Sequence, residues 1–170
     1  MSNQVNTSIR RETSTCYHCG EECKDEILHI GEKDFCCTGC KLVYEVLSES
    51  DLCTYYEIAD KPGLSQKSVS GRDNRFDYLD DADIVRKLVD FQNAEETHIT
   101  FSIPLIHCAS CIWLLENLHK LHSGIISGRV EFIKKKVQVK YLQDKISLKE
   151  LVRLLSRIGY EPTINLADAD

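Results

Sequence analysis

Two cysteines separated by two residues stand in the stretch LIHCASCIWLLENLHKL, at positions 108 and 111. They lie between an apolar segment and a run with the spacing of an amphipathic helix. A helix N-terminus favours negative charge and so lowers the pKa of a thiol. Two such thiolates suit a soft ion of low coordination number, for which Cu(I) is the biological candidate. Zinc would require four ligands, and this loop supplies only Cys108 and Cys111.

Two other interpretations of this loop are open. A Cys-x-x-Cys pair can be a thioredoxin-like redox centre, but Ala109-Ser110 stands where such enzymes usually have Gly-Pro. His107 is a candidate third ligand, although a histidine beside a ligand is more often simply exposed. An exposed site with two ligands would let a partner's thiols take the ion, which suits transfer between proteins better than storage.

A second cysteine cluster, CYHCGEEC…FCCTGC, lies near the other end of the chain. Its knuckle, hairpin and helix follow one another in a treble-clef-like order. A tetrahedral site of this kind takes two thiolates from the knuckle and two from the first helical turn, and Zn²⁺ is the default metal. We favour Cys16, Cys19, Cys36 and Cys40 as the ligands, with Cys37 as a substitute.

The other cysteines and the histidine near this cluster are not expected to bind the metal. Cys23 and Cys53 are expected to be small buried residues, and His18 is expected to point outward from the knuckle. A domain of about 45 residues has little core, so a structural metal would supply folding energy.

Composition limits the class of protein. Nine cysteines in a chain without a secretory signal or a long apolar run indicate metal or redox sites in a reducing compartment, so we expect a soluble, cytosolic chain. Residues 97–165 carry 10 basic and 5 acidic residues, whereas the rest of the chain is strongly acidic. The acidic half argues against nucleic acid as a partner, because phosphate binding needs clustered cations.

The elements that position the first cluster are a hairpin within 26–37, a helix from Cys40 and a short helix capped by Ser50. Residues 60–75 are rich in Pro, Gly, Ser and charge, and we expect a linker there, followed by a helix over 80–92. The predicted divisions are a disordered N-terminus (1–14), a Cys-rich treble-clef-like domain (15–59), a linker with one helix (60–96) and a C-terminal domain (97–166).

The second half shows clear periodicity. Alternating apolar residues predict strands over 97–105, 124–133 and 136–142, and a last strand follows over 161–167. A helix over about 111–122 and a second one capped by Ser147 and Glu150 lie between them. The order β-α-β-β-α-β predicts an α+β, ferredoxin-like fold. Both thiols would then lie at an exposed edge, between the first strand and the first helix.

This fold and loop together resemble the heavy-metal-associated (HMA) domain, the module of copper chaperones and of the cytoplasmic ends of copper pumps. The family loop reads Gly-Met-x-Cys-x-x-Cys, and here Leu105 and Ile106 stand at the Gly-Met positions. The resemblance implies that Ile106 packs as the methionine does. It also implies a role beside the metal for Tyr160, which falls where bacterial members place a tyrosine.

The paired motifs CYHCG…FCCTGC and IHCASCIWLLENL resemble the N-terminal region of a class of bacterial copper-transporting P-type ATPases, over about residues 14–166. The resemblance implies a fragment that binds Cu(I) at Cys108 and Cys111 and exchanges it with a copper chaperone or with the other domains of the pump. ATP hydrolysis would belong to the parent pump, on the cytoplasmic side of the inner membrane, and the fragment itself would not be an enzyme.

Two alternative functions stay open. The chain could be a free-standing metallochaperone or metal-responsive regulator, and an apolar segment of roughly 20 residues just beyond Asp170 would favour the pump instead. A thiol oxidoreductase is the third reading.

Overall fold

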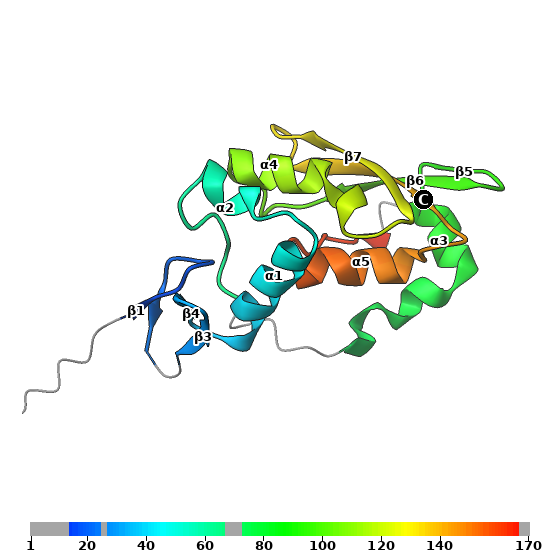
Figure 1. Ribbon diagram of the computed structural model, residues 1–170. Helices are drawn as coiled ribbons and strands as arrows, with labels where there is room; N and C mark the ends of the chain where they lie inside the picture. Colours follow the sequence, from blue (N-terminus) through cyan, green and yellow to red (C-terminus); the bar gives the residue numbers. More distant parts are fainter. Residues whose placement is uncertain (1–13, 25–26, 67–72, 167–170) are drawn as a thin grey trace, which may run out of the picture.

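The computed structural model describes residues 14–24, 27–66 and 73–166 (Figure 1). The predicted disordered N-terminus lies outside these residues, except for Ser14, and so does the stretch 67–72 of the predicted linker. The described residues form short helices and small antiparallel sheets, which confirms the α+β class.

The N-terminal part contains two small hairpins followed by two helices. The predicted hairpin is present, with Leu28 opposite Phe35 and a tight turn at Gly31. A further pair of strands closes the loop around the first two cysteines. The elements are β1 (Ser14–Thr15), β2 (Glu22–Cys23), β3 (Leu28–Ile30), β4 (Lys33–Phe35), α1 (Thr38–Glu49) and α2 (Thr54–Ile58).

Helix α1 is capped by a cysteine and buries one narrow stripe of apolar side chains. The Cys37 sulfur accepts a hydrogen bond from the backbone N–H of Cys40, which satisfies one of the free donors of the first turn. Val43 and Leu47, one turn apart, are fully buried. Leu42, on the same helix, is exposed. Ser50, predicted to cap the second helix, instead ends α1.

The middle of the chain is more closely packed than a linker. The 3-10 helix η1 (Asp73–Asp80) buries Phe76 and Leu79 in the main core. Charged pairs then join it to the C-terminal part: Arg75 with Glu161 at 2.9 Å, and Lys149 with Asp77 and Asp80 at 2.8 Å.

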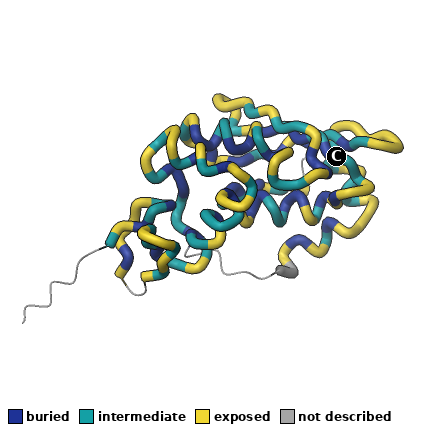
Figure 2. The backbone as a smooth tube through the Cα atoms, in the orientation of Figure 1, coloured by how far each residue is buried: buried dark blue, intermediate teal, exposed yellow. Residues whose placement is uncertain are grey.

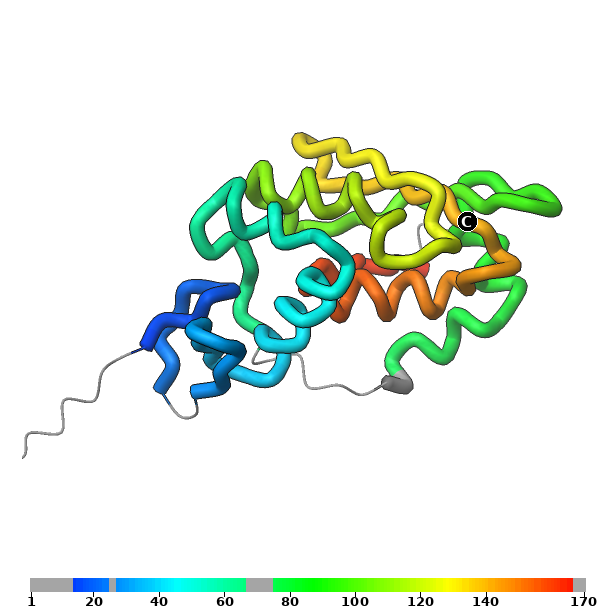
Figure 3. The backbone as a smooth tube through the Cα atoms, viewed as in Figure 1, coloured from blue at the N-terminus to red at the C-terminus, as the bar shows by residue number. Residues whose placement is uncertain are grey.

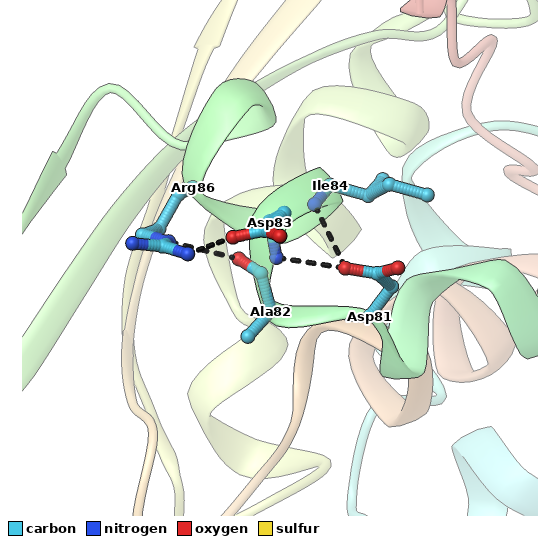
Figure 4. Close-up of polar contacts among 5 residues, drawn as sticks. All are labelled: Asp81, Ala82, Asp83, Ile84 and Arg86. Atoms are coloured by element: carbon cyan, nitrogen blue, oxygen red, sulfur yellow. Dashed lines mark hydrogen bonds and ion pairs between the residues drawn. The ribbon is translucent and has the colours of Figure 1, made fainter.

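The helix predicted over 80–92 is shorter. Helix α3 (Ala82–Leu88) is capped by Asp81, whose carboxylate accepts hydrogen bonds from the backbone N–H groups of Asp83 and Ile84 (Figure 4). On the surface of this helix, Arg86 forms an ion pair with Asp83. Phe91, which falls within the predicted helix, lies instead in β5 (Phe91–Gln92) and is half exposed. The backbone becomes extended at Val89 and turns to pair with the next strand.

The C-terminal part matches the predicted element order, except at its end. The sheet has the order β5-β6-β8-β7 and is antiparallel throughout. Over the described positions 161–166, the strand expected over 161–167 is reduced to one bridge between Thr163 and Ser102 of β6, and position 167 lies outside the described residues. The elements are β6 (Glu96–Ser102), α4 (Ala109–Glu116), η2 (Leu118–Lys120), β7 (Ile125–Glu131), β8 (Lys136–Leu142) and α5 (Leu148–Arg157).

The predicted alternation and capping are confirmed in this part. Ile99 and Phe101 of β6 are buried, as are Val137 and Val139 of β8. Helix α5 starts with the complete capping box of Ser147 and Glu150, and its apolar stripe is buried.

Two clusters of buried side chains hold the molecule together. The smaller one surrounds the first cysteine cluster. The larger one joins the four-stranded sheet, α4 and α5 to apolar residues of α1, α2 and η1 (Figure 2). Helix α1 contacts both the hairpin β3–β4 and α5, and α2 packs against α4 (Figure 3). Helices α1 and α2 therefore share a core with the C-terminal sheet, whereas the four clustered cysteines lie in the smaller core.

Candidate metal centres

Four thiols converge where the first loop meets the start of α1. The sulfur atoms of Cys16, Cys19, Cys36 and Cys40 all lie within 4.8 Å of one another. Cys16 and Cys19 come from the turn between β1 and β2, Cys36 follows β4, and Cys40 is in the first turn of α1. These are the four residues that the sequence favours.

The spacing of these sulfurs fits a tetrahedral metal. Zinc–thiolate bonds of about 2.3 Å place neighbouring sulfurs about 3.8 Å apart in a tetrahedron. The Cys19–Cys36 and Cys36–Cys40 sulfur distances are 3.6 and 3.7 Å. Cys16 and Cys40 are fully buried, so the site is largely closed to solvent. Closed sets of four thiolates are typical of structural metal sites.

The protonation of the four thiols is unequal. The hydrogen bond from the Cys40 thiol lowers the pKa of Cys16 to about 4. The same contact and burial raise the pKa of Cys40. Burial is the main cause that raises the pKa values of Cys19 and Cys36. A cation bound among these thiols would take the place of their protons, because cysteine binds a metal as the thiolate.

The other cysteines of this region lie outside the group of four. Cys37, the predicted substitute, caps α1 and is not in the cluster, because the extended backbone before the helix turns Cys36 inward instead. Cys23 is buried as expected, whereas Cys53 is only half-buried. His18, predicted to point outward, is almost fully buried, and its Nδ1 atom lies 2.8 Å from the Tyr56 hydroxyl.

The second centre lies at the start of α4. Cys108 is the N-cap residue and Cys111 lies one turn later, so their sulfurs are 3.3 Å apart. The Cys108 sulfur does not cap the helix, unlike the equivalent Cys37 in α1. The two thiols differ in access, since Cys108 is half-buried and Cys111 is fully buried. The prediction that both lie at an exposed edge is therefore wrong for Cys111.

Cys111 is covered by a tyrosine from the end of the chain. The Tyr160 hydroxyl donates a hydrogen bond to its sulfur at 2.9 Å. Burial raises the pKa of the Cys111 thiol, and the Tyr160 hydrogen bond opposes that change. Ile106 is fully buried in the main core, as expected for a residue that anchors the loop.

His107 lies next to the pair but is turned toward the backbone. Its Nδ1 atom is 3.4 Å from the Cys111 sulfur and 2.9 Å from the Leu105 carbonyl oxygen. A carbonyl can only accept a hydrogen bond, so Nδ1 carries the hydrogen. Nδ1 cannot bind a metal while it donates to the Leu105 carbonyl, but His107 forms one group of possible ligands with Cys108 and Cys111, whose ligand atoms all lie within 4.8 Å of one another.

Sequence reasoning missed one residue of this centre. The hydroxyl of Tyr55, in α2, lies 2.7 Å from the Tyr160 hydroxyl. Tyr55 is completely buried, and α2 packs against α4. The adjacent tyrosines Tyr55 and Tyr56 in the short stretch DLCTYYEIA were the available signal, because two neighbouring hydroxyls on one helical turn can reach different partners.

The comparisons support the metal-binding interpretation for the first half. Residues 15–93 match the model of a family described as "Putative metal-binding domain of cation transport ATPase". This segment contains all four clustered cysteines and ends before Cys108. No curated protein and no solved structure matches the chain. Within the described residues, no helix has both the length and the apolar character needed to span a bilayer.

Proposed function

We propose that this chain is the cytoplasmic metal-binding region of a copper-transporting P-type ATPase. In this proposal the four-cysteine site holds structural Zn²⁺, and Cys108 and Cys111 bind Cu(I) and pass it on. The family match over residues 15–93 supports a cation transport ATPase of some kind. The choice of copper rests on the second centre.

The observation that carries this choice is the pair of sulfurs 3.3 Å apart at the start of α4. Two thiolates at a helix N-terminus form a soft site of low coordination number, which Cu(I) accepts and Zn²⁺ does not favour. Cys108 is the more accessible of the two. An incoming thiolate from a partner would therefore reach the ion from the Cys108 side.

The order of elements around this pair supports a ferredoxin-like HMA domain over residues 97–166. The order β6, α4, β7, β8, α5 corresponds to the first five elements of that plan, and Thr163 bridges back to β6 where the last strand would lie. By the same proposal, residues 15–59 form the treble-clef-like domain and residues 60–96 connect the two.

The surface beside the loop favours an acidic partner. Three consecutive lysines, 134–136, occupy the turn between β7 and β8 and its exit. Lys135 donates a hydrogen bond to the Ile106 carbonyl, so this turn lies directly beside the cysteine loop. A copper chaperone with an acidic face, or another domain of the parent pump, would be an electrostatic match. ATP hydrolysis would belong to the parent protein.

A competition titration of the reduced protein with Cu(I) and Zn²⁺ tests the proposal. We expect one tightly bound Cu(I) that is lost in Cys108→Ser/Cys111→Ser, with Zn²⁺ retained by the same variant. Cys53→Ser is the matched control, because Cys53 is half-buried and belongs to neither centre. If Cu(I) binding survives the double substitution unchanged, the first cluster is the copper site and the assignment of roles is wrong.

A thiol oxidoreductase is the second candidate, because the same two sulfurs need to approach only from 3.3 Å to about 2.05 Å to form a disulfide. Such an enzyme would cycle between dithiol and disulfide in a reduction assay. In that cycle Cys108 would form a mixed disulfide with the substrate, and the Cys111 thiolate would then attack the Cys108 sulfur and release the substrate thiol. We expect little turnover, because burial raises the pKa of Cys111 and so leaves little of the resolving thiolate. Turnover that disappears in the double variant would favour this candidate over copper transfer.

A further inference from the structure

The hydroxyls of two adjacent tyrosines of α2 contact residues beside different cysteine centres. The Tyr55 hydroxyl lies 2.7 Å from that of Tyr160, which in turn donates to the Cys111 sulfur. The Tyr56 hydroxyl lies 2.8 Å from Nδ1 of His18, which sits inside the knuckle of the four-cysteine cluster. One helical turn thus touches both centres.

The hydrogen atoms in the first contact can be assigned. A phenol has a single hydrogen to donate. Tyr160 donates its hydrogen to the Cys111 sulfur, so the hydroxyl of Tyr55 must be the donor in the contact between the two tyrosines. Tyr55 therefore orients the hydroxyl of Tyr160 toward Cys111, and acts on the thiol through it.

The second contact is held just as firmly. A Cβ atom on Gly63 would lie 2.1 Å from the His18 ring, so the ring is packed directly against the backbone. The backbone of Gly63 also donates to the His18 carbonyl at 3.0 Å. His18 lies between Cys16 and Cys19 in the sequence, so a change in the position of those two cysteines must move the ring that Tyr56 contacts.

We propose that α2 couples the two centres, so that the state of the four-cysteine cluster sets how firmly Cys111 is covered. A metal in the cluster fixes the knuckle, which holds His18 and Tyr56; Tyr55 on the same turn then keeps Tyr160 against Cys111. Coupling between two binding sites is reciprocal. If the cluster metal changes the affinity of Cys111 for its ion by some factor, that ion must change the affinity of the cluster for its metal by the same factor. This inference rests on the proposed function only for the identity of the ions.

The test measures the rate at which iodoacetamide alkylates Cys111 in the full chain, with the modified residue assigned by tandem mass spectrometry. Alkylation of a buried thiol requires local opening, so the rate reports how often the cover lifts. We expect at least a fivefold higher rate after zinc is stripped from the cluster, which is the lower end of typical coupling between sites.

Removing the metal can also unfold the smaller core, so zinc-loaded variants carry the test independently. Tyr56→Phe deletes only the hydroxyl that contacts His18, yet we expect it to raise the alkylation rate of Cys111 about fivefold. We expect a similar increase for Tyr55→Phe, which deletes the hydroxyl that contacts Tyr160. Tyr141→Phe is the matched control, since Tyr141 is buried in the same core and its hydroxyl interacts with Thr97 instead. An unchanged Cys111 rate in zinc-loaded Tyr56→Phe would overturn the coupling.

A parallel Cu(I) titration separates this inference from the proposed function. Coupled alkylation rates without Cu(I) binding would refute the copper proposal and leave the coupling in place. Tight Cu(I) binding at Cys108 and Cys111, together with alkylation rates that ignore both zinc and Tyr56, would do the opposite.

Discussion

Gly128 of β7 lies directly against the carbonyl oxygen of Leu115 in α4, so closely that a Cβ atom at position 128 would be 2.2 Å from that oxygen. Only a residue without a side chain allows the helix backbone to approach the strand this closely. The same helix carries Cys111 in its first turn. The position of the second metal centre on the sheet is therefore set in part by a glycine.

Substitution of this glycine should displace α4. We expect Gly128→Ala to lower the free energy of unfolding by about 1–3 kcal/mol, because the added methyl group overpacks the contact with Leu115. Ser127→Ala, one position earlier on the strand, removes an atom and should stay within about 0.5 kcal/mol of the parent. Urea unfolding followed by circular dichroism measures both, and equal values for the two variants would contradict the close approach.

The adjacent cysteines before α1 should behave differently. Cys36→Ser removes one of the four clustered sulfurs, so we expect loss of bound Zn²⁺ and of the metal-dependent rise in Tm. Cys37→Ser should keep the metal, because serine is a favoured N-cap residue and the Cys37 sulfur serves only as the cap. A chelator assay for zinc content decides; zinc loss in Cys37→Ser alone would reverse the ligand assignment.

Alkylation should also distinguish the two thiols of the second centre. In the copper-free, reduced protein we expect Cys108 to react at least about tenfold faster than Cys111, because burial raises the pKa of the Cys111 thiol and blocks access to it. Timed iodoacetamide labelling with tandem mass spectrometry gives both rates from one peptide. Equal rates would show that Tyr160 does not cover Cys111 in solution.

Alkaline pH should destabilise the fold partly through Tyr141. Burial raises the pKa of this phenol from 10.0 to about 12 in the folded protein. A group with a raised pKa contributes its full stability below the unfolded value and loses it as pH rises through the folded value. Between about pH 10 and 12 the urea midpoint should therefore fall more steeply for the parent than for Tyr141→Phe. Parallel slopes would contradict the shift.

The sequence allowed prediction of the elements whose signals are local. The alternation in 136–142 fixes β8, and the Ser147–Glu150 capping box fixes the start of α5. The convergence of Cys16 and Cys19 with Cys36 and Cys40 was also predictable, because a hairpin between two cysteine pairs brings its ends together.

The remaining features depend on contacts between distant residues, which carry no periodic signal. Phe76 and Leu79 fall in a charged segment, and only their packing near α5 makes them core residues. His18 is buried because Gly63, far along the chain, leaves room for its ring. Within the described residues, the last strand is reduced to a bridge at Thr163. The hydroxyl of Tyr160 covers Cys111, and it contacts Tyr55 of α2, a helix whose pattern is too short to predict a partner.

The shared core has a practical consequence for dissecting this protein. An excised fragment beginning near residue 97 would retain Cys108, Cys111 and Tyr160, but it would lack Tyr55 and the apolar residues of α1 and α2 that complete the core. Such a fragment would present newly bared apolar surface and an uncovered thiol. Affinities and reactivities measured on it would describe a different environment from that in the whole chain.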